Sequence, residues 1–477
     1  MTANKQLIDG SWTDAIGGGT WDLVNPATGQ VIDVVPYGNG VDADLAIQAA
    51  ARALDEWKGL GPSRRGAILN GAADLINERA ERYGMITTEE SGKPLSQSIA
   101  EWQSAPSYLR FAASEAARIG GRVISSQVLG RKIDVTYSPI GVVGVIAAWN
   151  FPVYNINRAA SSALAVGCTV VARPSEFTPR SAFLYAEALV DAGVPPGVFN
   201  VINGSPPDMA REMLDNPVVR KIQFTGSARV GKLLMDGASR TVTNLSLELG
   251  GNAPVIVMPD VADLAAVSQG AVRAKYRNGG QVCISPQRFL IHASIADEFA
   301  SVASTLSAAL RVGDPMEPTT DVGPLINETQ RDRVASIVEA SIDAGARPLT
   351  GATTLDRSGY FYQPTVLSGV RPGTPALTEE IFGPVLPVVA FDTLDEALTI
   401  ANSVEHGLAS FVWTSDLTTA MDASDRLEYG MVGVNEWYPV AAEAPFGGVK
   451  QSGMGRESGT EGILEYLEPK TRYIRGL

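Results

Sequence analysis

The chain has 477 residues, 45% hydrophobic and 19% charged, a composition typical of a globular protein of two or three domains. A formal net charge of −14 argues against nucleic-acid binding and against anionic membrane surfaces, because both require a basic surface. No apolar run is long enough to span a membrane, the amino-terminal residues lack the hydrophobic core of a secretory signal, and two cysteines cannot form a disulfide framework. We therefore expect a cytoplasmic protein.

The first large segment follows a helical pattern, from residue 41 to about residue 118. Asp42 is the expected N-cap of the helix VDADLAIQAAARALDEW, and Ser63 is expected to cap the next one. Residues 119–138 then combine paired glycines, β-branched residues and a central Leu-Gly turn. This pattern predicts a β-hairpin or arm between larger units.

Strands and helices alternate after that arm. GVVGVIAAW, TVVARP, VFNVING and KIQFTG are expected strands, and each is followed by a helical segment. Repeated βα units predict a parallel, doubly wound sheet with helices on both faces and a ligand site at the carboxyl ends of its strands. A second α/β stretch begins near residue 251 with PVIVM and continues to about residue 450, and the tail EYLEPKTRYIRGL is again strand-like.

The histidine content restricts the chemistry, because His292 and His406 are the only two. No CxxC or HExxH spacing occurs, so we expect no metal site. His292 stands in the strand-like run RFLIHA, where a packed residue is the expected role, and His406 stands in a segment predicted to be a loop. Neither histidine is favoured as a catalytic residue.

Two motifs suit a dinucleotide. FTGSARVGK places Gly226 and Gly231 between a strand and a helix, where backbone N–H groups bind pyrophosphate, although tight strand–helix packing explains the glycines about as well. In ARPSEFTP, Arg173 and Glu176 follow a strand end, where a carboxylate accepts hydrogen bonds from ribose hydroxyls. The alternative for this pair is a surface ion pair.

Cys283, Asn150 and Glu248 each lie in a Gly- or Pro-containing turn, in NGGQVCISP, AAWNFP and LELGGNAP. Oxidation of an aldehyde to an acid needs a thiolate nucleophile, donors for an oxyanion and a base for water, and these three residue types supply those groups. Taken singly, the same residues suit a small buried hydrophobe, a turn former and a solvated carboxylate. Cys168, inside an apolar run, is expected to be a core residue.

Together these stretches resemble the aldehyde dehydrogenase superfamily along essentially the whole chain. The matching motifs, in order, are AWNFP, RPSEFTP, FTGS, LELGGNAP, GGQVC, EEIFGPV and PFGGVKQSGMGRE. The resemblance implies a Rossmann-like NAD(P)-binding domain of residues 1–118 and 139–250, a catalytic α/β domain of residues 251–465, and an oligomerisation arm of residues 119–138 and 466–477. It also implies a homodimer or homotetramer.

By this resemblance, Cys283 is the nucleophile, Asn150 forms an oxyanion hole with the Cys283 backbone N–H, and Glu248 activates the water that hydrolyses the thioester. The implied cofactor is NAD, with NADP as the alternative, because Glu176 would repel a 2′-phosphate while Arg173 weakens that repulsion. Glu457 matches a carboxylate sometimes assigned to proton relay. The residues expected to hold the cofactor are Trp149, Arg173, Glu176, Gly226, Ser227, Leu249, Glu380 and Phe382.

The expected substrate is a small anionic aldehyde. Arg158 and Arg277 match arginines that hold the substrate carboxylate in succinate-semialdehyde dehydrogenases, the subfamily that the chain most resembles, whereas the competing role for either arginine is a structural salt bridge. A loop containing Trp437 and Tyr438 is bulkier than usual, which leaves an aromatic or uncharged aldehyde as the alternative. A CoA-acylating enzyme is less favoured because Glu248 is retained, and a catalytically silent scaffold has no support.

Overall fold

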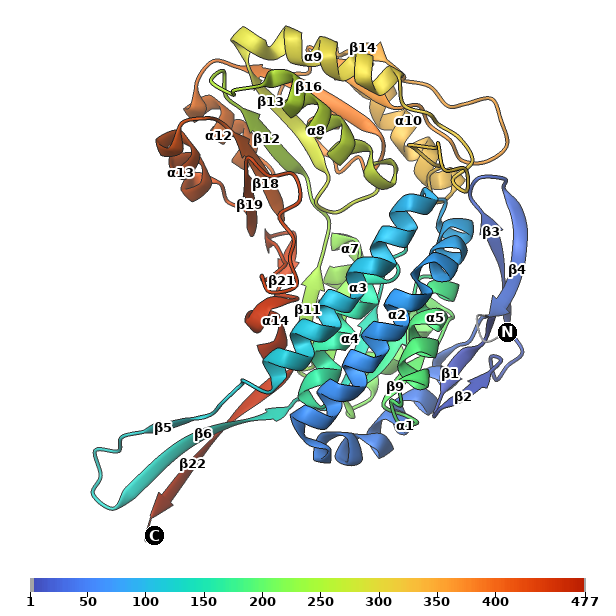
Figure 1. Cartoon of the computed structure of the whole chain (residues 1–477), viewed down its shortest axis with the longest axis vertical. Coiled ribbons are helices and arrows are strands. Elements are labelled where there is room, and N and C mark those ends of the chain that lie inside the picture. The colour runs from blue at the N-terminus through green and yellow to red at the C-terminus, as the bar shows by residue number, and fades with distance from the viewer. Residues whose placement is uncertain (1–3, 476–477) are drawn as a thin grey trace.

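Two helix-covered β-sheets organise the chain, and a long β arm extends from one end (Figure 1). The computed structural model describes residues 4–475. The first sheet has the strand order β2-β1-β9-β8-β7-β10-β11-β21, in which β9 to β11 run parallel and the outer strands are antiparallel. Its strands are β1 (Gln6–Ile8), β2 (Ser11–Thr13), β7 (Val142–Ile146), β8 (Thr169–Arg173), β9 (Phe199–Val201), β10 (Val219–Thr225), β11 (Asn244–Glu248) and β21 (Gly453–Met454).

Helices cover both faces of this sheet because side chains alternate along each buried strand. In β7, Val143 and Val145 belong to one hydrophobic core, whereas Val142 and Ile146 belong to the other. The first core contains α2 (Gly61–Ser91), α3 (Leu95–Ala116), α4 (Tyr154–Val166) and α5 (Pro179–Asp191). The second contains α1 (Gly40–Gly59), α6 (Pro206–Asp215) and α7 (Ala228–Ala238). The predicted doubly wound parallel sheet is confirmed.

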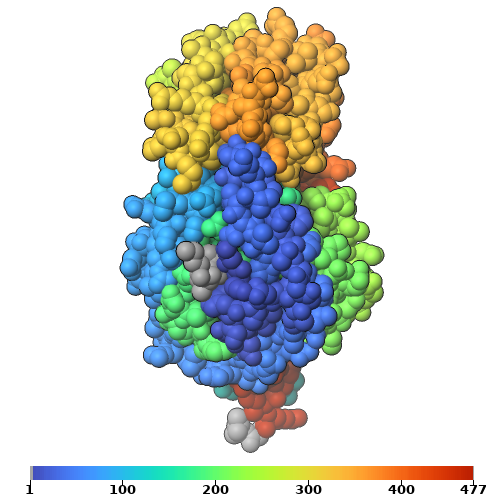
Figure 2. All heavy atoms as spheres, turned by 90° about the vertical axis from the view of Figure 1, so that its right-hand side faces the viewer, coloured from blue at the N-terminus to red at the C-terminus, as the bar shows by residue number. Residues whose placement is uncertain are grey.

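The second sheet has the order β14-β15-β16-β13-β12-β18-β19 and is parallel except at β14. Its strands are β12 (Ala253–Val257), β13 (Pro286–His292), β14 (Arg347–Thr350), β15 (Thr365–Ser368), β16 (Val385–Phe391), β18 (Ala409–Trp413) and β19 (Met431–Val434). One face packs on α8 (Leu264–Tyr276) and α9 (Ala293–Ala308), and the other on α10 (Glu328–Asp343), α12 (Leu394–Asn402) and α13 (Leu417–Arg426). In Figure 2 this unit, mostly yellow and orange, lies above the blue and green first unit.

The arm consists of β5 (Arg122–Ile124), β6 (Arg131–Pro139) and the carboxyl-terminal β22 (Leu467–Arg475), all antiparallel. The predicted β-hairpin is therefore confirmed, and the tail strand pairs with β6 along its whole length. The remaining elements are β3 (Thr20–Asn25), β4 (Gln30–Pro36), η2 (Arg277–Gly280), α11 (Pro375–Thr378), β17 (His406–Gly407), β20 (Val449–Lys450) and α14 (Gly459–Leu464). His406 thus starts a two-residue strand rather than a loop.

Both predicted helix caps are wrong. Helix α1 begins earlier, with Asn39 as its N-cap, and Asp42 is the third residue of a capping box that accepts from the Asn39 backbone N–H. Helix α2 begins at Gly61 with no side-chain cap, so Ser63 lies inside its first turn. Asp42 is fully buried and also accepts hydrogen bonds from Gln6 and from the Ile16 backbone N–H, a role that explains an acid at this position.

The described residues contain neither a membrane-spanning helix nor a cluster of metal ligands. No helix in residues 4–475 combines the length and the hydropathy of a membrane span. The same residues contain no group of three or more His, Cys, Asp or Glu side chains arranged to hold a metal ion. Cys168 is a fully buried core residue, and neither it nor Cys283 is in a disulfide.

Candidate active site

Cys283 lines two cavities, each of which is formed by residues of both units of the chain. It follows η2, a turn in which Asn278, Gly279 and Gly280 all adopt positive φ angles. Gly251 packs so closely on this segment that a Cβ there would lie 2.3 Å from the Cys283 carbonyl oxygen. The loop after β11 and the cysteine loop are therefore held against each other, and only glycine fits at their contact.

The first cavity, of about 340 Å³, contains most of the residues that the sequence motifs selected for the cofactor. Ser227 caps α7, so the amino terminus of that helix points toward the cavity. The buried Thr225 hydroxyl has no hydrogen-bond partner in the part of the chain that the structure describes. An open helix start and unpaired polar atoms fit a polar ligand of dinucleotide type. The predicted residues that line this cavity are Trp149, Asn150, Gly226, Ser227, Glu248, Leu249, Cys283, Glu380 and Phe382.

Arg173 and Glu176 do not line that cavity. Arg173 is the last residue of β8 and forms an ion pair with Glu176 just after it, with Arg173 Nη2 2.7 Å from Glu176 Oε2. Arg173 also donates to the Gly204 carbonyl at 2.9 Å and is 5% exposed, so the pair is part of the fold rather than a loose surface contact. Glu176 therefore balances the charge of Arg173.

The EEIFGPV loop enters the first cavity from the second unit. Glu380 accepts a hydrogen bond from the Gly251 backbone N–H at 2.9 Å, and burial raises the pKa of its carboxyl to about 7. Phe382 has a φ of +52° and packs edge-on against Trp149, with ring centroids 5.5 Å apart. Arg333 and Gln330 of α10 hold the loop by donating to its backbone carbonyls. The sequence motifs did not reveal these two residues, because a helix distant in the chain presents them.

Glu248 is a buried carboxylate in the first cavity, and both of its oxygens lack a hydrogen-bond donor among residues 4–475. Burial raises its pKa well above the ordinary value, and the nearby Glu457 raises it further. Burial also raises the pKa of the Cys283 thiol to about 12, opposed by the charge of Arg158. Both pKa shifts favour the uncharged forms of these two groups, which line the same cavity.

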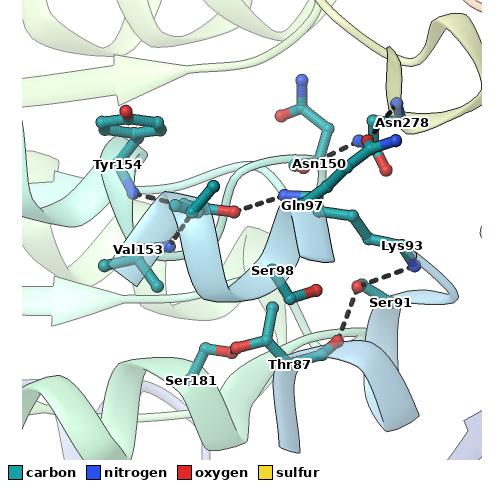
Figure 3. A network of polar contacts seen from close by, with 12 residues as sticks. Thr87, Ser91, Lys93, Gln97, Ser98, Asn150, Val153, Tyr154, Ser181 and Asn278 are labelled. Atoms are coloured by element: carbon teal, nitrogen blue, oxygen red, sulfur yellow. Dashed lines mark hydrogen bonds and ion pairs between the residues drawn. The ribbon is translucent and has the colours of Figure 1, made fainter. Parts of the chain in front are cut away.

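Asn150 is fixed by contacts from the cysteine loop. Its Nδ2 donates to the Gln281 carbonyl at 3.0 Å, and Asn278 donates to the Asn150 carbonyl at 2.9 Å. Asn278 in turn donates its backbone N–H to the Gln97 side chain of α3, at 2.8 Å, as Figure 3 shows. The Asn150 turn and the Cys283 turn thus form one hydrogen-bonded unit.

A buried ion pair supports the next residues of the Asn150 loop. Lys93 contacts Glu101, and Glu101 Oε1 accepts from the backbone N–H groups of Val153 and Tyr154 at 2.9 and 3.1 Å (Figure 3). Because α4 has no side-chain cap of its own, Glu101 supplies this function from α3. The Lys93 ammonium also lies 3.9 Å from the ring centroid of Phe151.

The second cavity, of about 100 Å³, has an aromatic and cationic lining on the other side of Cys283. Arg158 and Arg277 both line it, but their environments differ. Arg158 is buried, its Nε lies 3.0 Å from Glu457 Oε2, and its guanidinium packs on the Phe446 ring. Arg277 is half-buried, contacts only the rings of Phe151 and Tyr438 as a cation, and has no ion-pair partner among residues 4–475. The other lining residues include Tyr108, Tyr154, Asn155 and Val440.

The bulky loop does not narrow this cavity with its tryptophan. Trp437 is buried and stacks on Trp413, with ring centroids 4.7 Å apart, so it packs on the second sheet. Tyr438 is 45% exposed and lines a neighbouring cavity that also contains Arg277. Val440, two residues further along the loop, lines the cavity beside Cys283.

Comparison with known proteins identifies the family. A model described as "Aldehyde dehydrogenase family" matches residues 12–472, and the chain belongs to this family of NAD(P)-dependent oxidoreductases. It is 42% identical to mitochondrial succinate-semialdehyde dehydrogenase of Arabidopsis thaliana, over 98% of this chain and 89% of that protein. It is 39% identical to 3-sulfolactaldehyde dehydrogenase of Pseudomonas putida, over 100% and 98%. A solved succinate-semialdehyde dehydrogenase from Burkholderia pseudomallei superposes with a TM-score of 0.97, at 39% identity over 99% and 98% of the two chains.

Proposed function

We propose that this aldehyde dehydrogenase oxidises a small aldehyde that carries a carboxylate or sulfonate, with succinate semialdehyde as the first candidate. One observation carries the proposal: Arg277 lines the cavity beside Cys283 and has no carboxylate partner among the described residues. A cation left without an ion-pair partner in a partly buried cavity favours an anionic ligand, which a guanidinium can bind through two parallel hydrogen bonds. The relatives named above act on succinate semialdehyde and 3-sulfolactaldehyde, which agrees with this class.

The proposed chemistry uses three residues. Cys283 loses its thiol proton to solvent, and the thiolate adds to the aldehyde carbon to form a thiohemiacetal, whose oxyanion accepts hydrogen bonds from Asn150 Nδ2 and the Cys283 backbone N–H. When bound, NAD(P)+ supplies the hydride acceptor that turns this adduct into a thioester. Glu248 then takes a proton from water, which attacks the thioester, releases the carboxylic acid and restores the thiol. The unpartnered Glu248 oxygens support a water-based release rather than transfer to CoA.

For the cofactor, we propose that the nicotinamide side of NAD(P) occupies the cavity between Trp149, Glu380 and Phe382. The pyrophosphate would lie at the start of α7, near Gly226 and Ser227, against Leu249. The adenosine ribose would then reach Glu176 and Arg173 beyond β8. The Arg173–Glu176 ion pair leaves no free cation for a 2′-phosphate at that position, which supports NAD as the preferred cofactor.

The domain division, assembly and compartment complete the proposal. We assign residues 1–118 and 139–250 to NAD(P) binding, residues 251–465 to catalysis, and residues 119–138 with 466–477 to an oligomerisation arm. Residues 1–3 and 476–477 of these ranges lie outside the described structure. Exposed apolar side chains on the arm, up to 96% at Leu129, support a homodimer or homotetramer. Two free cysteines fit the reducing cytoplasm.

The test is a steady-state assay of nicotinamide reduction with succinate semialdehyde, butanal and benzaldehyde, each with and without CoA. We expect the highest kcat/KM for the charged aldehyde, free acid as the product, and no effect of CoA. Cys283→Ser should abolish activity with every substrate. Equal or higher kcat/KM for butanal or benzaldehyde would refute the anionic substrate class, and a CoA thioester product would refute the hydrolytic role of Glu248.

A further inference from the structure

A third asparagine connects the two ends of the substrate cavity. Asn155 lies in the first turn of α4, is 3% exposed, and lines the cavity together with Cys283 and Arg158. Its Nδ2 donates to the Ala148 carbonyl at 3.1 Å and to Asn150 Oδ1 at 3.2 Å. Its Oδ1 accepts from Arg158 Nη2 at 3.5 Å. One amide thus contacts both the Asn150 side chain and a cavity arginine.

These contacts determine which way the Asn150 amide faces. A backbone carbonyl can only accept, so the Asn155 group that faces the Ala148 carbonyl must be its NH2. The second hydrogen of that NH2 is directed at Asn150, which must therefore present its oxygen. The Asn150 NH2 consequently faces the cysteine loop, where one hydrogen bonds to the Gln281 carbonyl and the other has no acceptor among the described residues.

We propose that Asn155 is a positioning residue, which holds the Asn150 amide with its free N–H toward the thiohemiacetal oxygen and connects it to Arg158. The inference rests on the proposed role of Asn150 as the oxyanion donor. Without Asn155, the amide of Asn150 loses the only side-chain donor that holds its oxygen among the described residues. The Gln281 carbonyl alone would then hold the amide, so the free N–H would be less well directed at the oxyanion, and the acylation step would slow.

Two substitutions separate the contacts of Asn155. Asn155→Leu removes all of them at similar volume, whereas Asn155→Asp removes both donors and retains an acceptor for Arg158. Asn157→Leu is the matched control, because Asn157 is equally buried in the same helix but bonds only to the Ala105 carbonyl and the Tyr185 hydroxyl. The readout is the rate of the first turnover of nicotinamide reduction, measured by stopped flow with butanal so that the substrate charge does not interfere.

We expect both Asn155 variants to slow this first turnover by roughly 10- to 100-fold, less than the roughly 100- to 1,000-fold loss typical of removing an oxyanion donor. The decisive measurement combines Asn155→Leu with Asn150→Ala. If Asn155 acts through Asn150, adding Asn155→Leu to the Asn150→Ala background should change the rate by less than about twofold.

The positioning role would be overturned if the rate losses of the two single variants multiplied in the double variant. It would also be overturned if Asn155→Leu and Asn157→Leu had the same first-turnover rate. Either result would leave the proposed function intact. A wild-type first-turnover rate in Asn150→Ala would overturn the oxyanion assignment itself, and the positioning role with it. Circular dichroism melts of all variants identify any loss that follows from unfolding rather than from misplaced donors.

Discussion

Arg277→Ala should change which aldehydes the enzyme prefers rather than how well it works in general. Arg277 is held by two aromatic rings, with its Cζ 5.0 Å from the Phe151 centroid and 5.6 Å from that of Tyr438, and by no carboxylate among the described residues. Its charge is therefore available to a substrate. Removing it deletes the partner of the substrate anion without leaving a buried carboxylate of the protein unpaired.

The magnitude follows from the partial burial of Arg277. Two unit charges about 4 Å apart interact by about 4 kcal/mol at the effective dielectric constant of a protein surface, and truncating one partner of a desolvated pair costs about 2–5 kcal/mol. We therefore expect a loss of about 2–4 kcal/mol, which is roughly a 30- to 1,000-fold fall in kcat/KM for succinate semialdehyde. For butanal only the ring contacts change, so kcat/KM should vary by less than about fivefold.

The assay compares kcat/KM for these two substrates in the wild type, Arg277→Ala and Arg277→Lys, at constant ionic strength. Arg273→Ala is the matched control, since Arg273 carries the same charge one helical turn earlier, is exposed, and does not line the cavity beside Cys283. Arg277→Lys should lie between the other two because an ammonium lacks the bidentate geometry. Equal losses for both substrates in Arg277→Ala would refute the reasoning and make this arginine structural.

Arg158→Ala should behave differently, lowering kcat/KM for charged and neutral aldehydes alike, because it leaves Glu457 buried and unpaired beside Glu248. Glu248→Gln should allow one turnover and then stall at the thioester, which a burst of one reduced nicotinamide per subunit would reveal. Glu176→Ala should raise kcat/KM with NADP+ relative to NAD+, measured with both cofactors, because Arg173 is then free for a 2′-phosphate. Finally, kcat/KM should rise from about pH 7 to about pH 9, because burial raises the pKa of the Cys283 thiol to about 12 and higher pH therefore produces more of the thiolate; a flat profile would count against this. 

The three catalytic candidates could be found from the sequence because each lies in or beside a Gly- or Pro-containing turn at the end of a predicted strand or helix. Glu248 ends β11, and the Asn150 turn follows β7 two strands away in the same sheet. Parallel strands bring such ends to one edge, so a doubly wound sheet already predicts that these residues approach one another. Cys283 joins them from the second unit, through the close contact between Gly251 and its backbone, which no local pattern indicated.

The wrongly predicted helix caps show why the local sequence pattern did not determine the role of every residue. Asp42 has the residue type of an N-cap, but Asn39 takes that position, and Asp42 is needed three residues later to bond to Gln6 and Ile16 in a buried corner. Trp437 is a similar case. Its loop lies next to the substrate cavity, yet the ring stacks on Trp413, a partner whose proximity depends on the pairing of β18 with β19.

The two cavity arginines could not be told apart from the sequence, and this difference decides the electrostatics of the site. Arg158 is neutralised by Glu457, so the net positive charge of the cavity comes from Arg277 alone among these groups. The chain as a whole carries a formal net charge of −14, which repels an anionic substrate. Salt screens this repulsion for charges that lie more than about 10 Å from the substrate. Attraction by one unpaired guanidinium in a partly buried cavity is screened far less, so it outweighs the distant charges for a substrate already at the site.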